Sequence, residues 1–500
     1  LTRRISQLAN VLAQAGAKPG ATIAVMDWDS HRYLECYFAI PSMGCVIQTV
    51  NIRLSPEQIL YTLNHARAEI VIVNAEMLEM IEVVADKLET AKTFILIDEA
   101  GVKPRSRLSF FGEFEALMDK ASPEYDFPDF DENAQATTFY TTGTTGLPKG
   151  VYYSHRQIVL HAMAVLATFG TAPGQGRVCE DDVYMPITPM FHAHAWGWPY
   201  AATLLGMKQV YPGRYTPEEV MRWITNEDVT FSHCVPTLLH MILMHPDSAK
   251  IDFRGRKFLI GGGALPGGLA KLALDRGIDI YTGYGMSETG PMQIVNHLSK
   301  EEAALDVAEQ IPLRQRAGRP VLLCDVRTVD ENLKRLPRDG EAIGEVVFRS
   351  PWLTMGYHAN AETSEALWEG GWLHSGDLGK FLPDGTLRIC DRLKDVIKTG
   401  GEWVSSLDLE SLVSRHPAVS EVAAIALKDD KWGERPMVLI VLKPGAQADA
   451  QAIRTHLAAF VDQGLISKYA VPDRVIFVEA LEKTSVGKLD KKLLRARYDV

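Results

Sequence analysis

The chain has 500 residues, and at roughly 150 residues per domain this length suggests about three folding units. Its 46% hydrophobic and 23% charged residues are ordinary for a soluble globular protein, which excludes collagen, coiled coil and wholesale disorder. The formal net charge of −11 provides no general attraction to nucleic acid or anionic lipid, so local groups must hold any anionic ligand.

The six cysteines are spread through the chain without a Cys-x-x-Cys pair, which argues against a zinc site and against a disulfide scaffold. We therefore expect a reducing, cytoplasmic location. The longest apolar run, residues 158–169, is shorter than the roughly 20 residues that a bilayer requires. No membrane span is expected.

The first two hundred and sixty or so residues alternate short β-branched runs with helical patterns, which is typical of parallel sheets covered by helices. Ahead of the first run, Ile5, Leu8 and Leu12 stand at helical spacing and predict an amphipathic helix. The chain does not begin with Met, so we expect the N-terminus of this domain to be incomplete. The runs expected as strands include residues 21–25, 69–73, 93–97 and 257–260.

A second pattern begins near Gly318, where short strands separated by turns indicate an antiparallel barrel or sheet. These strands are expected over residues 325–329, 344–348 and 386–389. After Asp391 the pattern changes again and suits a separate α+β unit. We expect helices over residues 408–416 and 450–463, and strands over 421–427 and 437–442.

The most informative segment is rich in glycine and threonine: Tyr140-Thr-Thr-Gly-Thr-Thr-Gly-Leu-Pro-Lys-Gly150. Backbone N–H groups and hydroxyls in such a segment can converge on an anion, and Lys149 adds a positive charge. A phosphate chain is the expected ligand. The segment is not a Walker A loop, because Lys149 follows Pro148 and precedes Gly150. On its own, it is equally consistent with an ordinary polar turn.

Four further motifs decide between these alternatives. They are Tyr284-Gly-Met-Ser-Glu288, Ser375-Gly-Asp-Leu378, Asp391-Arg-Leu-Lys-Asp395 and Thr484-Ser-Val-Gly-Lys-Leu-Asp490. Together with the glycine-rich segment, and in the same order, they resemble the motifs of the adenylate-forming superfamily of acyl-CoA synthetases, luciferases and peptide-synthetase adenylation domains. The resemblance covers nearly the whole chain.

The resemblance implies an α/β fold with two domains. Residues 1–393 would form a large N-terminal, AMP-binding domain of two parallel-sheet α/β subdomains plus a β-barrel. Residues 394–500 would form a small, mobile α+β C-terminal domain, with Lys394 as the hinge between the two.

The resemblance also implies ATP and Mg2+. A carboxylate that attacks ATP meets a triphosphate of the same charge, so cations must neutralise the reacting phosphate. Lys488 would bridge the acyl carboxylate and the α-phosphate, Glu288 would hold Mg2+, and His192 occupies the family's gating position. The residues assigned to ATP binding are Thr141, Thr142, Gly143, Thr144, Thr145, Gly146, Lys149, Gly263, Ala264, Tyr284, Gly285, Met286, Ser287, Asp377 and Arg392.

The acyl pocket is expected to include Trp196, Gly197, Val235 and Gly261. An indole in its wall leaves little room, so the resemblance favours short- to medium-chain acids, with core packing behind the pocket as the alternative role for Trp196. The two histidines at His192 and His194 have no third ligand of matching context, which argues against a metal there.

The resemblance places Gly400, Gly401 and Trp403 in the tunnel for the pantetheine arm of CoA. Trp403 replaces a common Asn and Ser406 a common Pro, as in the branch of medium-chain fatty acid and methylmercaptopropionate CoA ligases. Lys491 stands where the family often has Arg, and the sequence suggests no role for it.

We therefore expect an acid:CoA ligase that forms an acyl-adenylate and pyrophosphate from ATP, then transfers the acyl group to CoA and releases AMP. A stand-alone adenylation enzyme that delivers to an acyl carrier protein is the nearest alternative. A catalytically inactive nucleotide-binding homologue is another, although the presence of both Glu288 and Lys488 argues against it. The expected partners are the acid, ATP and CoA, with no nucleic acid, and a homodimer is compatible with the sequence.

Overall fold

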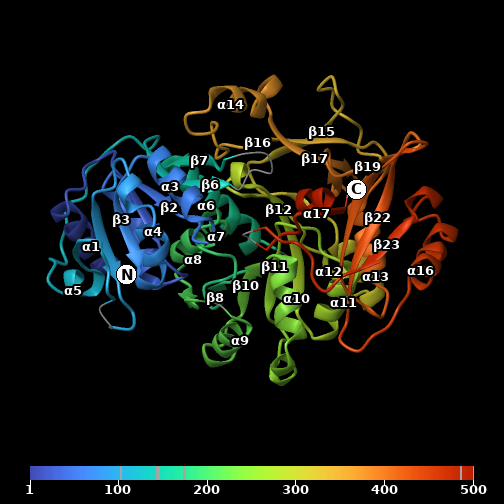
Figure 1. Ribbon diagram of the computed structural model, residues 1–500, viewed down its shortest axis with the longest axis horizontal. Coiled ribbons are helices and arrows are strands. Elements are labelled where there is room, and N and C mark those ends of the chain that lie inside the picture. Colours follow the sequence, from blue (N-terminus) through green and yellow to red (C-terminus); the bar gives the residue numbers. More distant parts are fainter. Residues whose placement is uncertain (102–103, 142–146, 173–175, 215, 485–486, 499–500) are drawn as a thin grey trace.

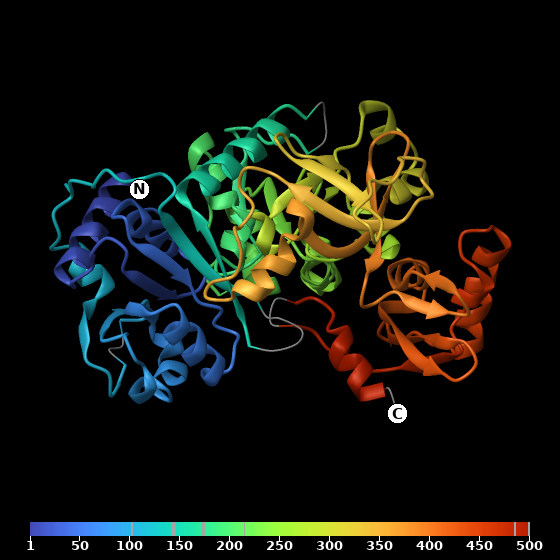
Figure 2. The ribbon, with the colours of Figure 1, turned by 90° about the horizontal axis from the view of Figure 1, so that it is seen from above.

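The computed structural model of the protein describes residues 1–101, 104–141, 147–172, 176–214, 216–484 and 487–498. Within these ranges the strands form four sheets, with helices packed against them (Figure 1). Three sheets precede Lys394 in the chain and the fourth follows it. Figure 2 shows the fourth sheet and its helices as a lobe at one end of the molecule.

The first sheet has seven strands in the order β5-β4-β3-β1-β2-β6-β7, and only the β6–β7 hairpin is antiparallel. It confirms the strands predicted over residues 21–25, 69–73 and 93–97. Its strands are nearly continuous hydrophobic runs because helices cover them. The strands are β1 (Thr22–Met26), β2 (Val46–Thr49), β3 (Ala68–Asn74), β4 (Thr93–Ile97), β5 (Phe110–Glu113), β6 (Gln135–Thr141) and β7 (Lys149–Ser154). The helices of this part are α1 (Thr2–Gln14), α2 (His31–Ser42), α3 (Pro56–His65), α4 (Leu78–Glu82) and α5 (Phe114–Met118).

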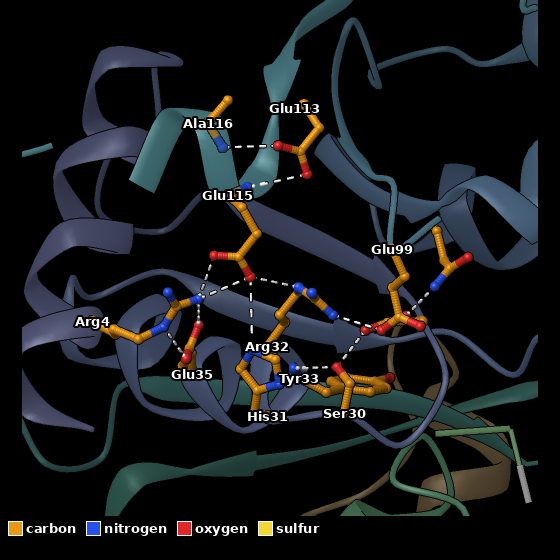
Figure 3. A network of polar contacts seen from close by, with 12 residues as sticks. Arg4, Ser30, His31, Arg32, Tyr33, Glu35, Glu99, Glu113, Glu115 and Ala116 are labelled. Carbon is orange, nitrogen blue, oxygen red and sulfur yellow. Dashed lines mark hydrogen bonds and ion pairs between the residues drawn. The ribbon is translucent and has the colours of Figure 1, made fainter. Parts of the chain in front are cut away.

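The predicted N-terminal helix is α1, and its residues Leu8 and Leu12 are fully buried. A network of charges joins it to α2 and α5 (Figure 3). Glu115 on α5 accepts a hydrogen bond of 2.9 Å from Arg4 on α1 and one of 2.6 Å from Arg32 on α2. Three helices that are far apart in the sequence therefore meet at one carboxylate.

The second sheet has the order β14-β13-β12-β11-β10-β8-β9, parallel from β9 to β12 and antiparallel beyond. It confirms the strand predicted over residues 257–260. The strands are β8 (Val183–Pro186), β9 (Lys208–Gln209), β10 (Phe231–Cys234), β11 (Lys257–Ile260), β12 (Asp279–Gly285), β13 (Met292–Val295) and β14 (Arg319–Pro320). The helices are α6 (His155–Gly170), α7 (Ala193–Trp196), α8 (Trp198–Leu205), α9 (Pro217–Asn226), α10 (Pro236–Met244), α11 (Gly267–Asp275), α12 (Lys300–Ala303) and α13 (Val307–Arg314).

The third sheet corrects the expectation of a β-barrel. It is an open antiparallel sheet in the order β15-β16-β17-β18, with α14 (Ala361–Leu367) beside it. The edge of β18 meets Gly318 through an isolated bridge to Leu387 and does not pair with β15 among the described residues, so the sheet does not close on itself. The strands are β15 (Asp325–Val329), β16 (Gly344–Arg349), β17 (Leu373–Phe381) and β18 (Leu387–Arg392).

The fourth sheet confirms the α+β pattern predicted after Asp391. Its path is β20-β19-β22-β21, and β23 pairs with β22. The strands are β19 (Ile397–Thr399), β20 (Glu402–Val404), β21 (Val419–Asp429), β22 (Gly433–Leu442) and β23 (Arg474–Phe477). The helices are α15 (Ser406–Val413), α16 (Ala450–Asp462) and α17 (Lys491–Tyr498).

All six cysteines are unpaired, as their spacing predicts. In the part of the chain that the structure describes, we find no helix that is both long and apolar enough to cross a bilayer.

Candidate active site

A cavity of about 1520 Å3 lies where the second sheet, the third sheet and the C-terminal lobe meet. The strands β10, β11 and β12 end at it, and the carboxyl ends of parallel strands are where α/β sheets bind ligands. Most of the residues predicted for the site line this cavity. They are Thr141, Lys149, His192, Val235, Gly263, Ala264, Tyr284, Gly285, Met286, Ser287, Glu288, Asp377, Arg392, Lys394 and Lys488.

The described residues at the two ends of the glycine-rich segment belong to β6 and β7. Thr141, the last residue of β6, pairs with Lys149, the first residue of β7, so both stand at the mouth of the cavity. The predicted residues Thr142, Gly143, Thr144, Thr145 and Gly146 lie outside the described residues.

Glu288 is a buried carboxylate in the wall of the cavity, with 8% of its surface exposed. The hydroxyl of Tyr357 donates to its Oε1 atom at 2.7 Å. Burial raises the pKa of Glu288, and this hydrogen bond and the charges of Lys149 and Lys488 oppose the rise. A carboxylate oxygen is a suitable ligand for Mg2+, so the position fits the predicted metal.

Asp377 and Arg392 are paired residues on the neighbouring strands β17 and β18. Nε of Arg392 lies 3.4 Å from Oδ1 of Asp377, and the hydroxyl of Tyr284 donates to Oδ2 at 2.7 Å. Burial raises the pKa of Asp377, and Arg392 opposes the rise most strongly. A carboxylate beside a guanidinium can hold the vicinal hydroxyls of a ribose. The ring of Tyr284 lies next to the carboxylate of Asp377 and can stack on a flat ligand.

Two glycines let the backbone come close to the ligand space. At Gly285, a Cβ atom would lie 1.7 Å from the carbonyl oxygen of Pro291, so only glycine fits. At Gly262, where φ is +71°, a Cβ atom would lie 3.0 Å from Cε of Lys488. The lysine stem therefore lies directly against the turn that follows β11.

Lys488 enters the cavity from the C-terminal lobe. The hydroxyl of Thr237 on α10 donates to the carbonyl oxygen of Gly487 at 2.6 Å. This bond holds Gly487, the residue before Lys488, against a helix of the N-terminal part of the chain. The pKa of Lys488 is lowered to about 8, mainly by burial and also by the charge of Arg392, whereas Asp377 and Glu288 oppose this decrease. The structure thus brings Lys488, Glu288 and Asp377 into one electrostatic environment.

The segment that contains Trp196 has an unusual backbone. Residues 193–197 all have positive φ, between 46° and 77°, and only the last is glycine. Such a left-handed turn costs roughly 1–2 kcal/mol for each non-glycine residue. Its approach is fixed by the N–H of Met190, which donates to Oδ1 of Asp29 at 2.8 Å, and by Thr137 and His194, whose side chains are 2.7 Å apart.

This turn places the predicted acyl-pocket residues unevenly. His192 and Val235 line the cavity, but Trp196, Gly197 and Gly261 do not. The indole of Trp196 is 6% exposed and lies against Gly261, where a Cβ atom would come within 3.0 Å of it. Its ring centroid is 5.0 Å from that of His233. Trp196 therefore packs behind the cavity wall.

His192 and His194 differ in surroundings but share a lowered pKa. Burial lowers the pKa of each to about 3, and Lys488 and Arg53 contribute at His192. Both rings are neutral at physiological pH. The described residues contain no group of three or more side chains placed to hold a metal ion, so neither histidine belongs to such a cluster.

The predicted CoA-tunnel residues lie elsewhere. Gly400, Gly401 and Trp403 do not line the cavity, and the indole of Trp403 is 52% exposed. The structure therefore brings the residues predicted for adenylation together and leaves those predicted for CoA apart.

Sequence reasoning missed one residue and one long-range contact that fasten the site. Tyr357, which contacts Glu288 from 69 positions away, is not part of a local motif that would have marked it. Thr237 belongs to the run Val235-Pro236-Thr237, which the resemblance places at the acyl pocket, but its contact with Gly487 across 250 positions is not predicted by the sequence.

Comparison with known proteins agrees with this site. The model of the AMP-binding enzyme family matches residues 1–358, and that of the AMP-binding enzyme C-terminal domain matches residues 408–488. The chain therefore belongs to the AMP-binding enzyme family, as the resemblance to the adenylate-forming superfamily implies.

Named relatives match over almost the full length. A long-chain-fatty-acid–CoA ligase of Thermus thermophilus is 38% identical over 99% of this chain and 89% of its own. A 3-methylmercaptopropionyl-CoA ligase of Ruegeria pomeroyi is 36% identical over 98% of this chain and 90% of its own. The crystal structure of the anthranilate CoA ligase AuaEII with anthranoyl-AMP superposes with a TM-score of 0.86, at 26% identity, over 99% of this chain and 91% of that one. The predicted class, an ATP-dependent and AMP-forming acyl-CoA synthetase that uses Mg2+ and CoA, is confirmed.

Proposed function

We propose that the protein activates a short- to medium-chain carboxylic acid with ATP and then transfers the acyl group to CoA. The observation that carries this proposal is the meeting of Lys488, Glu288 and the Asp377–Arg392 pair at one cavity. The two relatives named above are CoA ligases, which supports the second step.

In the first step, an oxygen of the substrate carboxylate bonds to the α-phosphorus of ATP. The bond from this phosphorus to the bridging oxygen of the β-phosphate breaks, and pyrophosphate leaves. Lys488 stabilises the negative charge that develops on the α-phosphate, while Asp377 and Arg392 hold the ribose. When bound at Glu288, Mg2+ would neutralise further phosphate charge.

In the second step, the sulfur of CoA attacks the acyl carbonyl carbon, the bond from carbon to the phosphate oxygen breaks, and AMP leaves. We assign the division of the chain to residues 1–393 and 394–500, with Lys394 as the hinge. The position of Trp403 and of Gly400-Gly401 outside the cavity supports a rotation of the lobe before this step.

The proposed chain length follows from the packing of Trp196. The indole lies against Gly261 and His233 behind the cavity wall, and this packing supports a short acyl pocket. The long-chain name of the Thermus thermophilus relative makes acid length the property to measure first. We also propose a cytoplasmic location, which the six unpaired cysteines support, and a homodimer as the assembly to test.

The test begins with ATP/pyrophosphate exchange without CoA, using unbranched C2 to C12 acids and aromatic acids. We expect exchange that depends on the acid. CoA and an acyl carrier protein are then compared as acceptors for the preformed acyl-adenylate. Transfer to the carrier protein alone would favour the stand-alone adenylation enzyme, and absence of exchange with every acid would refute the enzyme assignment.

A further inference from the structure

A buried relay of polar side chains lies beside the hinge. Nζ of Lys491 contacts Oε1 of Glu410 at 2.7 Å and donates to Oγ of Ser406 at 2.6 Å. The hydroxyl of Ser406 in turn lies 3.0 Å from Oδ1 of Asp391 and donates to it. None of the four residues exceeds 9% exposure. The ammonium of Lys491 has two acceptors in this network and the hydroxyl of Ser406 has one, so hydrogen bonds link all four residues.

The relay crosses the proposed hinge. Asp391 precedes Lys394, whereas Ser406, Glu410 and Lys491 follow it. The backbone N–H of Ser406 adds a second bond to Asp391, 2.6 Å long to Oδ2, so one serine grips both oxygens of the carboxylate. A rotation of the C-terminal lobe about Lys394 would separate these partners and leave a buried carboxylate without them.

The relay is also joined to the catalytic lysine. Lys491 begins α17 and stands three positions after Lys488, so holding Lys491 restricts where Lys488 can lie. Arg495, one turn further along α17, donates to Oδ1 of Asp395 at 2.7 Å. Two cations on one face of the last helix therefore hold the segment that contains the hinge.

Ser406 is suited to a clean test because it is the first residue of α15. Ser405 caps this helix, and its hydroxyl accepts from the N–H of Asp408 at 3.0 Å. The N–H of a first helical residue has no partner within its own helix, so proline is tolerated there. Ser405 has extended backbone angles, φ −69° and ψ 118°, as a residue before proline requires.

We propose that Ser406 is a positioning residue that locks the lobe in the adenylation arrangement, because it bonds Asp391 before the hinge and Lys491 after it. The lock must open before CoA transfer. The proposal rests on the proposed function for its two half-reactions, but the lock itself is a property of the unliganded protein.

Three substitutions remove the hydrogen-bonding groups of Ser406 step by step. Ser406→Thr keeps the hydroxyl and the N–H, Ser406→Ala keeps only the N–H, and Ser406→Pro keeps neither. Asp473→Asn is the matched control, because it breaks the 2.6 Å ion pair with Arg435 inside the same lobe and away from the hinge. For each variant we would measure pyrophosphate exchange, CoA transfer from preformed acyl-adenylate, thermal stability, and small-angle X-ray scattering without ligands.

We expect the ratio of the CoA-transfer rate to the exchange rate to rise in the order Thr, Ala, Pro, by about tenfold for Ser406→Pro, since a charge-assisted hydrogen bond is lost. The scattering curve should move in the same order, and the control should change neither. If the variants lose exchange and CoA transfer to the same extent and their scattering is unchanged, Ser406 has a merely structural role and the proposed lock is wrong. If the wild type shows no exchange while Ser406→Pro still shifts the scattering, the proposed function fails and the lock stands.

Discussion

Lys488 has the central role in the proposed adenylation step. It is buried and lies against Gly262, and Glu288 and Asp377 favour its charged form whereas Arg392 disfavours it. Its pKa of about 8 lies just above neutral pH, so the residue is mostly charged there and loses its charge at only slightly alkaline pH.

This position predicts a pH dependence. Because the folded state lowers the pKa of Lys488 to about 8, the charged form that stabilises the reacting phosphate is present below that pH and disappears above it. We expect kcat/KM for adenylation to fall about tenfold for each pH unit above 8. An exchange assay from pH 6 to 10 would measure it.

Two variants serve as controls for this profile. In Lys488→Arg, the decline should move to much higher pH, since guanidinium stays charged. Lys488→Ala should lose adenylation but keep CoA transfer from preformed acyl-adenylate. A wild-type profile that stays flat to pH 10 would contradict the assignment.

At the level of elements, the left-handed turn over residues 193–197 bears on the proposed acyl pocket because it positions Trp196 behind the cavity wall. The turn is held from outside by Asp29 through Met190 and by Thr137 through His194. A turn with four strained non-glycine residues persists only where its surroundings fix it. Its effect is to hold the indole of Trp196 against Gly261.

Replacing Trp196 by alanine should therefore lengthen the pocket. We expect kcat/KM to peak at a longer acid in Trp196→Ala than in the wild type, with weaker activity on short acids, because each added methylene that fits contributes about 0.8 kcal/mol. A series of unbranched acids would measure the shift. Phe231→Leu, a core change on β10, is the control for stability alone. An unmoved optimum in a folded Trp196→Ala protein would reduce Trp196 to core packing.

The helices α1, α2 and α5 meet at Glu115, and this contact predicts that the stability of the fold depends on pH (Figure 3). Hydrogen bonds from His31, Arg4 and Arg32 lower the pKa of Glu115 to about 2, against burial. A carboxyl with a lowered pKa stabilises the fold above its ordinary pKa and ceases to do so as pH falls through the lowered value.

Glu115→Gln should accordingly lower the melting temperature by a few degrees at pH 6, with the difference from wild type narrowing between about pH 4.5 and pH 2. Calorimetry at several pH values would show it. Glu99→Gln removes an exposed partner of Arg32 only, and its effect should be smaller. A difference that persists unchanged at low pH would show that the charge of Glu115 is not its source.

At the scale of the whole molecule, the proposed rotation requires freedom at Lys394. Lys394→Pro fixes φ there and restricts Leu393, so the lobe should stall in the arrangement that the structure shows. We expect pyrophosphate exchange within about threefold of the wild type and a loss of at least tenfold in CoA transfer. Lys398→Pro, beyond the hinge on β19, is the control for a proline that harms only the lobe. Unchanged overall turnover in Lys394→Pro would refute alternation about this residue.

The sequence predicts that the motif residues meet at one place, and most of them line one cavity. Contiguous runs of glycines, hydroxyls, carboxylates and lysines make such residues recognisable. It does not predict Tyr357, since its contact with Glu288 depends on tertiary packing alone. The left-handed turn before Trp196 is likewise hidden, because its residues have no preference for that backbone. The expected barrel is wrong because closure depends on how edge strands pair, which an alternating pattern does not specify.

Lys488, a cation that the C-terminal lobe brings to the cavity, has a consequence for the direction of the reaction. By microscopic reversibility, pyrophosphate can attack the acyl-adenylate only with the same charge in place. Under the proposed rotation, the movement that admits CoA also withdraws Lys488 and so switches off the return to ATP. While the lobe is rotated, the acyl-adenylate can react with CoA but cannot return to ATP, so the rotation favours formation of the thioester.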